Sequence, residues 1–349
     1  MSFFWAKRKY NPAEVNTAGQ LLKTAASEDP ALEHALEVIN NWRSSHSFPL
    51  NTFQTTLRDK ARRVYPHALV AQRLKRVPSI KKKLIDRPSM KLTQMQDIGG
   101  CRAVVETVSD VVKLREAYLK SELRHRLHHQ KDYVAEPRDS GYRSVHLIYE
   151  YASDRTTTYN GLKVEVQIRS LHQHAWATAV ETAGLFLQHA LKSSEGPEEW
   201  LEFFTLASSA FAKQERTPPV PNTPSEWREL KALLKKKLVD LTVESRLYAY
   251  RDALKVVDNP QLGELDYYLL SQEVSASGSR LTITGYSKEQ LELATAAYLA
   301  EEKRLQSVDG GQAVLVSAGP LQSLKRAYPN FYLDTGRFIE YLRQILASN

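Results

Sequence analysis

The sequence predicts an α+β fold, and two patterns of apolar residues carry this prediction. Residues 163–169 (Lys-Val-Glu-Val-Gln-Ile-Arg) alternate polar and apolar side chains with the two-residue period of a half-buried β-strand. Leu32, Leu36 and Ile39 recur instead with the spacing of a helical stripe. A proline-rich stretch at 217–224 predicts an extended linker. These signals predict an N-terminal helical segment (1–66), a sheet-containing domain (67–216) and a smaller C-terminal α+β domain (225–349).

Composition and charge narrow the class of protein. The chain has 349 residues, enough for two or three domains, and a formal net charge of +8. A basic balance favours polyanionic partners such as nucleotides, RNA or DNA. The single cysteine, Cys101, excludes an internal disulfide and a CxxC zinc site, so a reducing, cytoplasmic location is expected. No apolar run approaches the roughly 20 residues of a membrane span, so no membrane partner is expected.

The segment 58–91 is the most basic part of the chain and predicts a phosphate site. Arg73 and Lys75 alternate as on an extended segment. Ser79 follows a proline at an expected helix N-cap, and Lys83 lies one helical turn further on. A helix start with a hydroxyl group and nearby cations suits a phosphate. Because the chain has no glycine-rich Walker motif, side chains would have to hold a triphosphate.

Asp97 marks a second candidate site, just before a short buried strand at 103–105. A carboxylate at a strand entrance, next to a pair of glycines, is well placed to bind Mg²⁺. The alternative is that Asp97 only forms a turn, because Asp and Gly are common in turns.

The remaining elements follow from local signals. We expect a loop over 44–50, one or two basic helices over 111–129, a strand from Gly141 to about Tyr151, a type I′ hairpin turn at Asn160-Gly161 and a helix over 171–191. In the C-terminal domain we expect a helix over 226–257, strands over 267–274 and 280–284, a helix over 287–305, a strand over 312–316, a short helix over 321–328 and a last helix from Asp334.

Five short motifs, taken in order, resemble the synthetase domain of the RelA/SpoT alarmone synthetases over roughly residues 45–195. They are Arg73-x-Lys75-x-x-x-Ser79-Ile80-x-x-Lys83, Asp97-Ile98-x-Gly100-x-Arg102, Lys131-Asp132-Tyr133, Gly141-Tyr142-x-Ser144-x-His146 and Glu165-x-Gln167-Ile168-Arg169. The resemblance implies a nucleotidyltransferase-like mixed sheet flanked by helices. It also implies transfer of a pyrophosphoryl group from ATP to a ribose 3′-hydroxyl, usually that of GDP or GTP.

The resemblance assigns a role to each matched position. Arg73 and Arg102 would sandwich the adenine, while Lys75, Ser79 and Lys83 would hold the triphosphate. Asp97 and Glu165 would bind Mg²⁺, and Glu165 would also accept the proton of the attacking hydroxyl group. The expected acceptor-side residues are Tyr142, which would stack on the base, together with Lys131, His146, Gln167 and Arg169. For His146 and Gln167, simple support of the strands is an equal alternative.

The acceptor stays open at this stage. The hydrolase and regulatory regions of the long family members have no counterpart in this sequence, so it resembles a short synthetase. Some short relatives are toxins that make alarmones, including adenosine forms, or that pyrophosphorylate the 3′-CCA end of tRNA, which the basic charge would suit. The C-terminal domain would then bind a protein partner, regulate the enzyme or act as a fused antitoxin. A non-catalytic module that binds RNA or nucleotides is the alternative from another class.

Overall fold

The structure is a computed structural model that describes residues 5–24, 29–187, 191, 196–257, 265–275, 278–305, 308, 311–317 and 331–348. The chain forms two compact units. The first comprises 1–133 and 144–171, and the second comprises 134–143 and 172–349. The boundary falls inside the range 67–216 that the sequence analysis treats as one domain.

The first unit is built on a five-stranded mixed sheet, which confirms the expected fold class. The strand order is β1-β2-β5-β4-β3, with β2 and β5 parallel and every other neighbouring pair antiparallel. The strands are β1 (Leu69–Leu74), β2 (Gly99–Val105), β3 (Arg126–Asp132), β4 (Val145–Glu150) and β5 (Lys163–Ser170). The helices are α1 (Pro12–Thr24), α2 (Pro30–Ser45), α3 (Ser47–Val64), α4 (Val77–Asp86), α5 (Val108–Leu119) and the 3₁₀ turns η1 (Leu92–Gln94) and η2 (Thr157–Tyr159).

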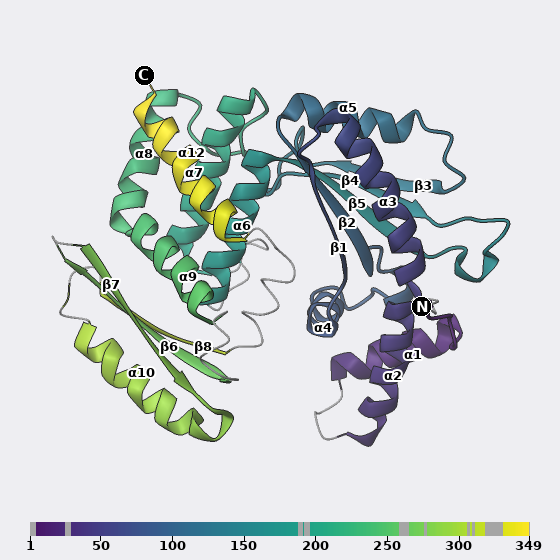
Figure 1. The fold of residues 1–349 in the computed structure, drawn as a ribbon, viewed down its shortest axis with the longest axis horizontal. Helices are drawn as coiled ribbons and strands as arrows, with labels where there is room; N and C mark the ends of the chain where they lie inside the picture. The colour runs from purple at the N-terminus through teal and green to yellow at the C-terminus, as the bar shows by residue number, and fades with distance from the viewer. Residues whose placement is uncertain are drawn as a thin grey trace. The chain divides into compact units, whose positions relative to one another are not determined.

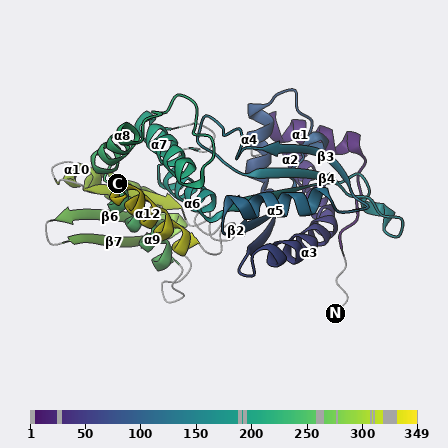
Figure 2. The same ribbon diagram turned by 90° about the horizontal axis from the view of Figure 1, so that it is seen from above.

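The two faces of this sheet differ in polarity. The apolar side chains of β2 and β5, such as Ala103, Val166 and Ile168, are fully buried. Helices α3 and α5 pack against these strands. Figure 2 shows both helices on one side of the sheet and α4 on the other. Burial of one face therefore leaves the alternate side chains of the same strands on a second, polar face.

The second unit combines helices with a small antiparallel sheet, drawn in teal to yellow in Figure 1. Helix α6 (Leu171–Phe186) begins at the boundary between the units. The others are α7 (Glu198–Glu215), α8 (Trp227–Asp240), α9 (Val243–Val257), η5 (Lys288–Gln290), α10 (Leu291–Leu305) and α12 (Phe331–Ala347). The sheet has the order β7-β6-β8, from β6 (Tyr267–Ser275), β7 (Gly278–Tyr286) and β8 (Gln312–Ser317). None of the helices in the described residues is both long and apolar enough to cross a membrane.

Two expectations at helix starts were wrong. The loop expected over 44–50 is reduced to His46, because α3 already begins at Ser47. Its Pro49 lies in the first helical turn, where a missing N–H costs little. Ser79 is not the N-cap of α4, since Arg76 occupies that position and Ser79 is the third helical residue.

Two further expectations were wrong, one for a helix and one for a turn. The second half of the helical range 111–129 is instead part of strand β3, which pairs with β4 along the edge of the sheet. The sequence of β3 has no alternating pattern, so only its partner strand reveals it. Asn160 (φ −58°, ψ 139°) and Gly161 (φ +84°) form a type II turn and not type I′.

In the second unit, the helix expected over 226–257 is broken in two. Thr242, with φ +46°, lies between α8 and α9, and neither glycine nor proline marks the break. The other strands and helices of this region occur close to where they were expected, including the last helix with Phe338, Leu342 and Ile345 buried. The short helix expected over 321–328 lies outside the described residues.

Gly141 and Gly161 allow a matched test of packing in the fold, because both have φ near +85°. A Cβ at Gly141 would lie 2.8 Å from Ser208 Cβ and 3.0 Å from the Trp176 ring, whereas a Cβ at Gly161 meets nothing within 4 Å. Each alanine variant should lose about 1–2 kcal/mol from the backbone conformation. Gly141→Ala should lose about 1–3 kcal/mol more from overpacking. Urea unfolding of both variants checks this, and equal losses would show that the contact is not responsible.

Candidate active site

The registers of the strands bring the predicted polar residues onto one face of the sheet. Gln167 in β5 lies opposite Arg102 of β2 and opposite His146 of β4. Glu165 lies two residues before Gln167, opposite Gly100, and so shares this face. The same face holds seven of the predicted residues: Arg73, Arg102, Lys131, His146, Glu165, Gln167 and Arg169.

A pair of lysines surrounds Asp97 at the entrance to β2. Lys75 Nζ lies 2.9 Å from one carboxylate oxygen, and Lys83 Nζ lies 2.8 Å from the other. Burial disfavours the charged carboxylate, but the two ammonium groups outweigh this effect and hold the pKa of Asp97 well below its ordinary value. Asp97 is therefore ionised at neutral pH.

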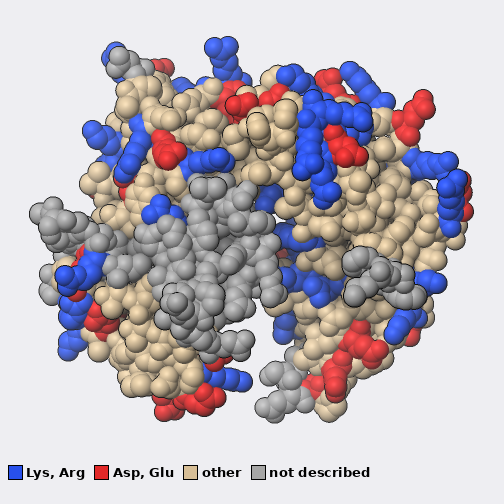
Figure 3. All heavy atoms as spheres, in the orientation of Figure 1, with Lys and Arg blue, Asp and Glu red and all other residues tan. Residues whose placement is uncertain are grey.

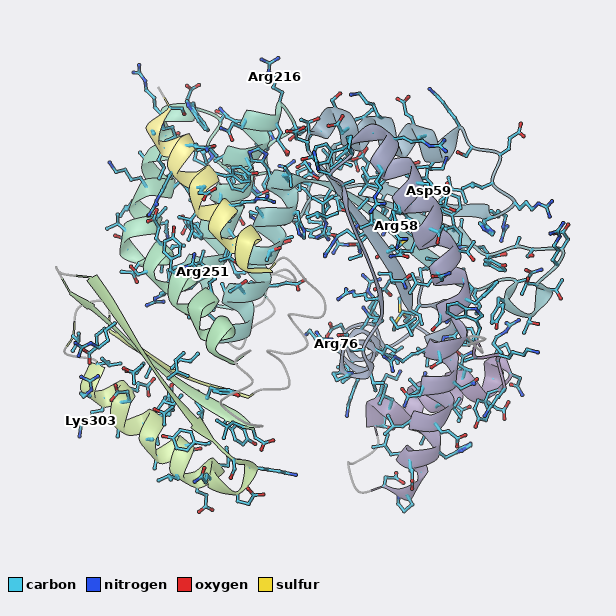
Figure 4. The ribbon with its side chains drawn as sticks, in the orientation of Figure 1. Arg58, Asp59, Arg76, Arg216, Arg251 and Lys303 are labelled. Atoms are coloured by element: carbon cyan, nitrogen blue, oxygen red, sulfur yellow. The ribbon has the colours of Figure 1, made fainter. Side chains whose placement is uncertain are left out.

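Three separate elements build this ion-pair triad. Lys75 directly follows β1, and its backbone N–H donates to the carbonyl oxygen of Ile98 at 2.7 Å. This bond extends the β1–β2 pairing to the residue after Asp97. Lys83 comes from α4, one turn after Ser79. Figure 4 shows Arg76 at the start of the same helix.

A second set of contacts runs along β5. His146 Nδ1 lies 3.0 Å from one oxygen of Glu165, and Gln167 Nε2 donates to the other at 2.6 Å. Arg169 Nη2 donates to Gln167 Oε1 at 3.2 Å. Burial raises the pKa of Glu165, but His146 and Gln167 more than compensate, so that the pKa is lowered overall.

Asp97 and Glu165 interact electrostatically. The charge of Asp97 raises the pKa of Glu165, which opposes the effect of His146. No group of three or more His, Cys, Asp or Glu side chains suited to a metal occurs in the described parts of the chain. Mg²⁺ in nucleotide sites is commonly held by one or two carboxylates with the substrate phosphates completing its shell. A pair of carboxylates beside cations suits Mg²⁺, which Asp97 and Glu165 would hold.

Tyr142 is the predicted residue that belongs to the other unit, within the segment 134–143. It is largely buried, and the Arg138 guanidinium lies 5.6 Å above its ring.

Sequence reasoning missed Arg43, at the end of α2. Its Nε donates to the carbonyl oxygen of Lys75 at 2.7 Å, and its Nη1 donates to Asn40. Burial lowers the pKa of this guanidinium. Arg43 thus fixes the backbone of a residue that pairs with Asp97. The residues around Arg43 do not predict this role, because the bond joins positions 32 residues apart in the sequence.

The geometry defines a class of site: two lysines suited to phosphate pair with the ionised carboxylate of Asp97, and a second ionised carboxylate, Glu165, lies on the polar face of the sheet. Comparison with known proteins agrees with this class. The family described as "Region found in RelA / SpoT proteins" matches residues 72–186. The chain therefore carries a RelA/SpoT-type domain, as the sequence motifs indicated.

Two curated relatives come from Bacillus subtilis (strain 168). GTP pyrophosphokinase YjbM is 36% identical over 115 residues, which cover 32% of this chain and 54% of the relative. GTP pyrophosphokinase YwaC is 34% identical over 84 residues, which cover 24% and 40%. The chain thus spans about half the length of these relatives, or less. A solved structure of the small alarmone synthetase 1 from Bacillus subtilis, bound to its product pppGpp, is 26% identical with a TM-score of 0.43 and covers 49% of this chain and 89% of that one.

Replacing Lys83 tests the ion-pair triad through its effect on acid unfolding. The pKa of Asp97 in the folded state lies below its ordinary value of 3.8, so the ionised carboxylate stabilises the fold above that pH and loses its contribution as the pH falls further. Lys83→Met removes one cation and should raise this pKa. We expect a loss of about 1–3 kcal/mol at pH 7 and acid unfolding at a higher pH.

Lys82→Met is the matched control, because Lys82 is one residue away and pairs with Asp86 at the exposed surface. It should change stability by less than about 1 kcal/mol. Circular dichroism between pH 7 and pH 2 compares the variants. Superimposable acid transitions for both variants would contradict the role assigned to Lys83.

Proposed function

We propose that this protein is an ATP-dependent pyrophosphokinase that transfers pyrophosphate from ATP to the ribose 3′-hydroxyl group of a guanosine nucleotide. The observation that carries the proposal is the carboxylate of Asp97 held between Lys75 and Lys83, together with Glu165, whose pKa the charge of Asp97 raises. The two curated relatives are named GTP pyrophosphokinases, which supports the same reaction class.

On the ATP side, Lys75, Ser79 and Lys83 would bind the triphosphate. Both lysines are held near each other by Asp97, so their charges are fixed in place before a nucleotide arrives. Arg73 and Arg102 lie on one face of neighbouring strands, as diagonal neighbours. That placement suits two guanidinium groups that contact the faces of an adenine.

Glu165 would act as the general base. The 3′-oxygen attacks the β-phosphorus of ATP, the bond between the α-phosphate and the β-phosphorus breaks, AMP leaves, and the hydroxyl proton passes to Glu165. The lowered pKa keeps Glu165 ionised and able to accept this proton. Bound Mg²⁺ would neutralise charge on the phosphates, which is most of what phosphoryl-type transfer demands.

On the acceptor side, Lys131, His146, Gln167 and Arg169 share the face that carries Glu165. The hydrogen bonds of His146 and Gln167 to Glu165 support both a role in catalysis and a role in holding this carboxylate. Tyr142 remains the predicted stacking partner of the acceptor base.

A tRNA acceptor is the second candidate, and surface charge favours it. Lys and Arg side chains gather over α3 and around β1 and α4 on the face seen in Figure 3. The exposed face of α3 contributes Arg62 and Arg63. A polyanion such as RNA would bind such a surface with strong dependence on salt.

The decisive experiment replaces the proposed base. Glu165→Gln keeps the shape of the side chain and its hydrogen bond to Gln167 in altered form, but it cannot accept a proton. We expect AMP formation from ATP to fall by about 10²–10⁴-fold with GDP, GTP or bulk tRNA as acceptor. Radiolabelled ATP and chromatography of the products measure the rate and identify the acceptor.

Glu150→Gln is the matched control at the far end of β4, where Glu150 pairs with Arg126 at the surface. It should leave the rate within about twofold, since exposed ion pairs contribute little. Undiminished turnover in Glu165→Gln would refute the assigned base. Absence of turnover in the unmodified protein with every acceptor, together with salt-dependent RNA binding, would favour a non-catalytic binding module.

A further inference from the structure

The motif Lys131-Asp132-Tyr133 ends strand β3, and the proposed reaction gives a role to its lysine alone. In the sheet, Lys131 lies opposite His146, and Asp132 lies opposite Val145. Tyr133 continues this pairing, because its backbone N–H donates to Ser144 O at 3.0 Å. Successive side chains of a strand point to opposite faces. Lys131 and Tyr133 therefore share the polar face, and Asp132 lies on the face that α5 covers.

The ring of Tyr133 packs against the imidazole of His146. The two ring centres are 5.2 Å apart, and the ring planes meet at 88°, an edge-to-face arrangement. The two residues are diagonal neighbours across β3 and β4, since His146 lies opposite Lys131. Aromatic rings favour this geometry over face-to-face stacking. The tyrosine ring therefore restricts the orientation of the imidazole.

That orientation matters for Glu165. His146 Nδ1 lies 3.0 Å from one carboxylate oxygen, and Gln167 Nε2 donates to the other. An imidazole that rotated would withdraw Nδ1 and release one of the two oxygens. A general base has to lie at a fixed position relative to the hydroxyl group that it deprotonates. Contacts that orient His146 therefore also orient the proposed base.

The opposite face of β3 is anchored by an ion pair. Arg115 Nη1, from α5, donates to Asp132 Oδ2 at 2.6 Å, and about a quarter of each side chain is exposed, 24% and 23%. A charge-assisted hydrogen bond of this kind is stronger than a neutral one. Strand β3 lies at the end of the strand order, with β4 as its neighbour. The bond to α5 thus gives this edge strand a second attachment, directly before Tyr133.

Ser144 connects the same point to the strand that carries Glu165. Its carbonyl oxygen accepts from Tyr133 N, and its Oγ donates to Ile168 O of β5 at 3.2 Å. The side chain of Ser144 is fully buried. Hydrogen bonds therefore link the end of β3, the start of β4 and β5, so that the rings of Tyr133 and His146 stand on fixed backbone.

We propose that Tyr133 is a positioning residue for the general base: its ring keeps His146 in contact with Glu165, and the ion pair of Arg115 and Asp132 holds Tyr133 in place from the other face. This inference rests on the proposed function, because Glu165 is the base only in that reaction. It gives Asp132 and Tyr133 separate tasks. Since Tyr133 acts through the base, its loss should lower kcat and leave the KM for ATP almost unchanged.

The test compares Tyr133→Leu and Tyr133→Phe with the unmodified full-length chain, with ATP and with GDP or GTP as acceptor. Tyr133→Leu should lower the kcat of AMP formation about tenfold, because the base loses its fixed position, with the KM for ATP within about twofold. Tyr133→Phe keeps the ring and should stay within about threefold of the unmodified kcat. A Phe variant as slow as the Leu variant would show that the ring is not responsible.

Tyr10→Leu is the matched control, because Tyr10 forms a similar edge-to-face pair with His34, with ring centres 5.9 Å apart and planes at 83°. This pair lies among residues that have no role in the proposed reaction. Tyr10→Leu should leave kcat and the KM for ATP unchanged. An equal fall of kcat in both leucine variants would overturn the proposal.

Arg115→Met tests the same positioning from the other face of β3, and it serves as the test if Tyr133→Leu is unfolded at the assay temperature. It should lower kcat about three- to tenfold. Arg126→Met, which removes an exposed ion pair with Glu150 at the other end of β3, should stay within about twofold. The double variant of Tyr133→Leu and Arg115→Met should lose less than the product of the single losses, because both act on one contact. Losses that multiply would show that the ion pair does not act through Tyr133.

Nuclear magnetic resonance of ¹³C-labelled histidine provides a readout that does not depend on turnover. The chain has ten histidines, so His146→Asn is needed to assign the resonance of His146. Tyr133→Leu should shift or broaden this resonance, whereas Tyr133→Phe should preserve it. If the unmodified chain makes no AMP with any acceptor, the proposed function fails, and the resonance still decides whether Tyr133 orders His146. If AMP forms and Tyr133→Leu leaves kcat unchanged, only the present proposal fails.

Discussion

The carboxylate of Asp97 between two ammonium groups is the interaction on which the candidate site depends. Burial of a carboxylate without nearby cations costs free energy, because the charge loses its hydration and gains no partner in exchange. The two lysines are likewise like charges that come close only because an anion separates them. Since Lys75 directly follows β1, Asp97 precedes β2 and Lys83 belongs to α4, this triad joins three elements. The edge of the sheet and the proposed phosphate site are therefore formed by the same contacts.

The polar face was predictable because it follows from the two-residue alternation of polar and apolar side chains in β5. Lys163 to Arg169 alternate strictly, and a strand with that pattern must turn Glu165, Gln167 and Arg169 to one side. The motifs that lie before and after it in the chain could be placed on neighbouring strands by resemblance, and the structure brings Arg102 and His146 level with Gln167. Local alternation thus fixed which side chains share a face, whereas the order of the strands required knowledge of the family.

What failed depends on contacts distant in sequence. Strand β3 has no pattern of its own, and its backbone bonds to β4 decide its structure. Arg43 bonds to Lys75 across 32 positions, and Arg143 bonds to Pro218 across 75. No glycine or proline marks the break between α8 and α9 at Thr242. For β3, Arg43 and Arg143 the bonding partner lies outside any local window of sequence, so propensity and spacing give no sign of it.

These distant contacts also change how the C-terminal region should be studied. Phe338 of α12 packs against Phe203, Phe204 and Phe211 of α7, with ring centres 5.6–6.3 Å apart. Helix α7 is the helix that carries Ser208, and burial of each such ring contributes about 1.5–3 kcal/mol. Removal of residues 218–349 would expose this aromatic core and delete the carbonyl group that Arg143 binds. Loss of activity after such a deletion would therefore not distinguish damage to this aromatic core from the loss of a regulator. A regulatory or partner-binding role for this region, which we predict from the sequence, is better examined with substitutions on exposed residues of α10, such as Leu293 and Leu299, because these leave the α7–α12 core intact.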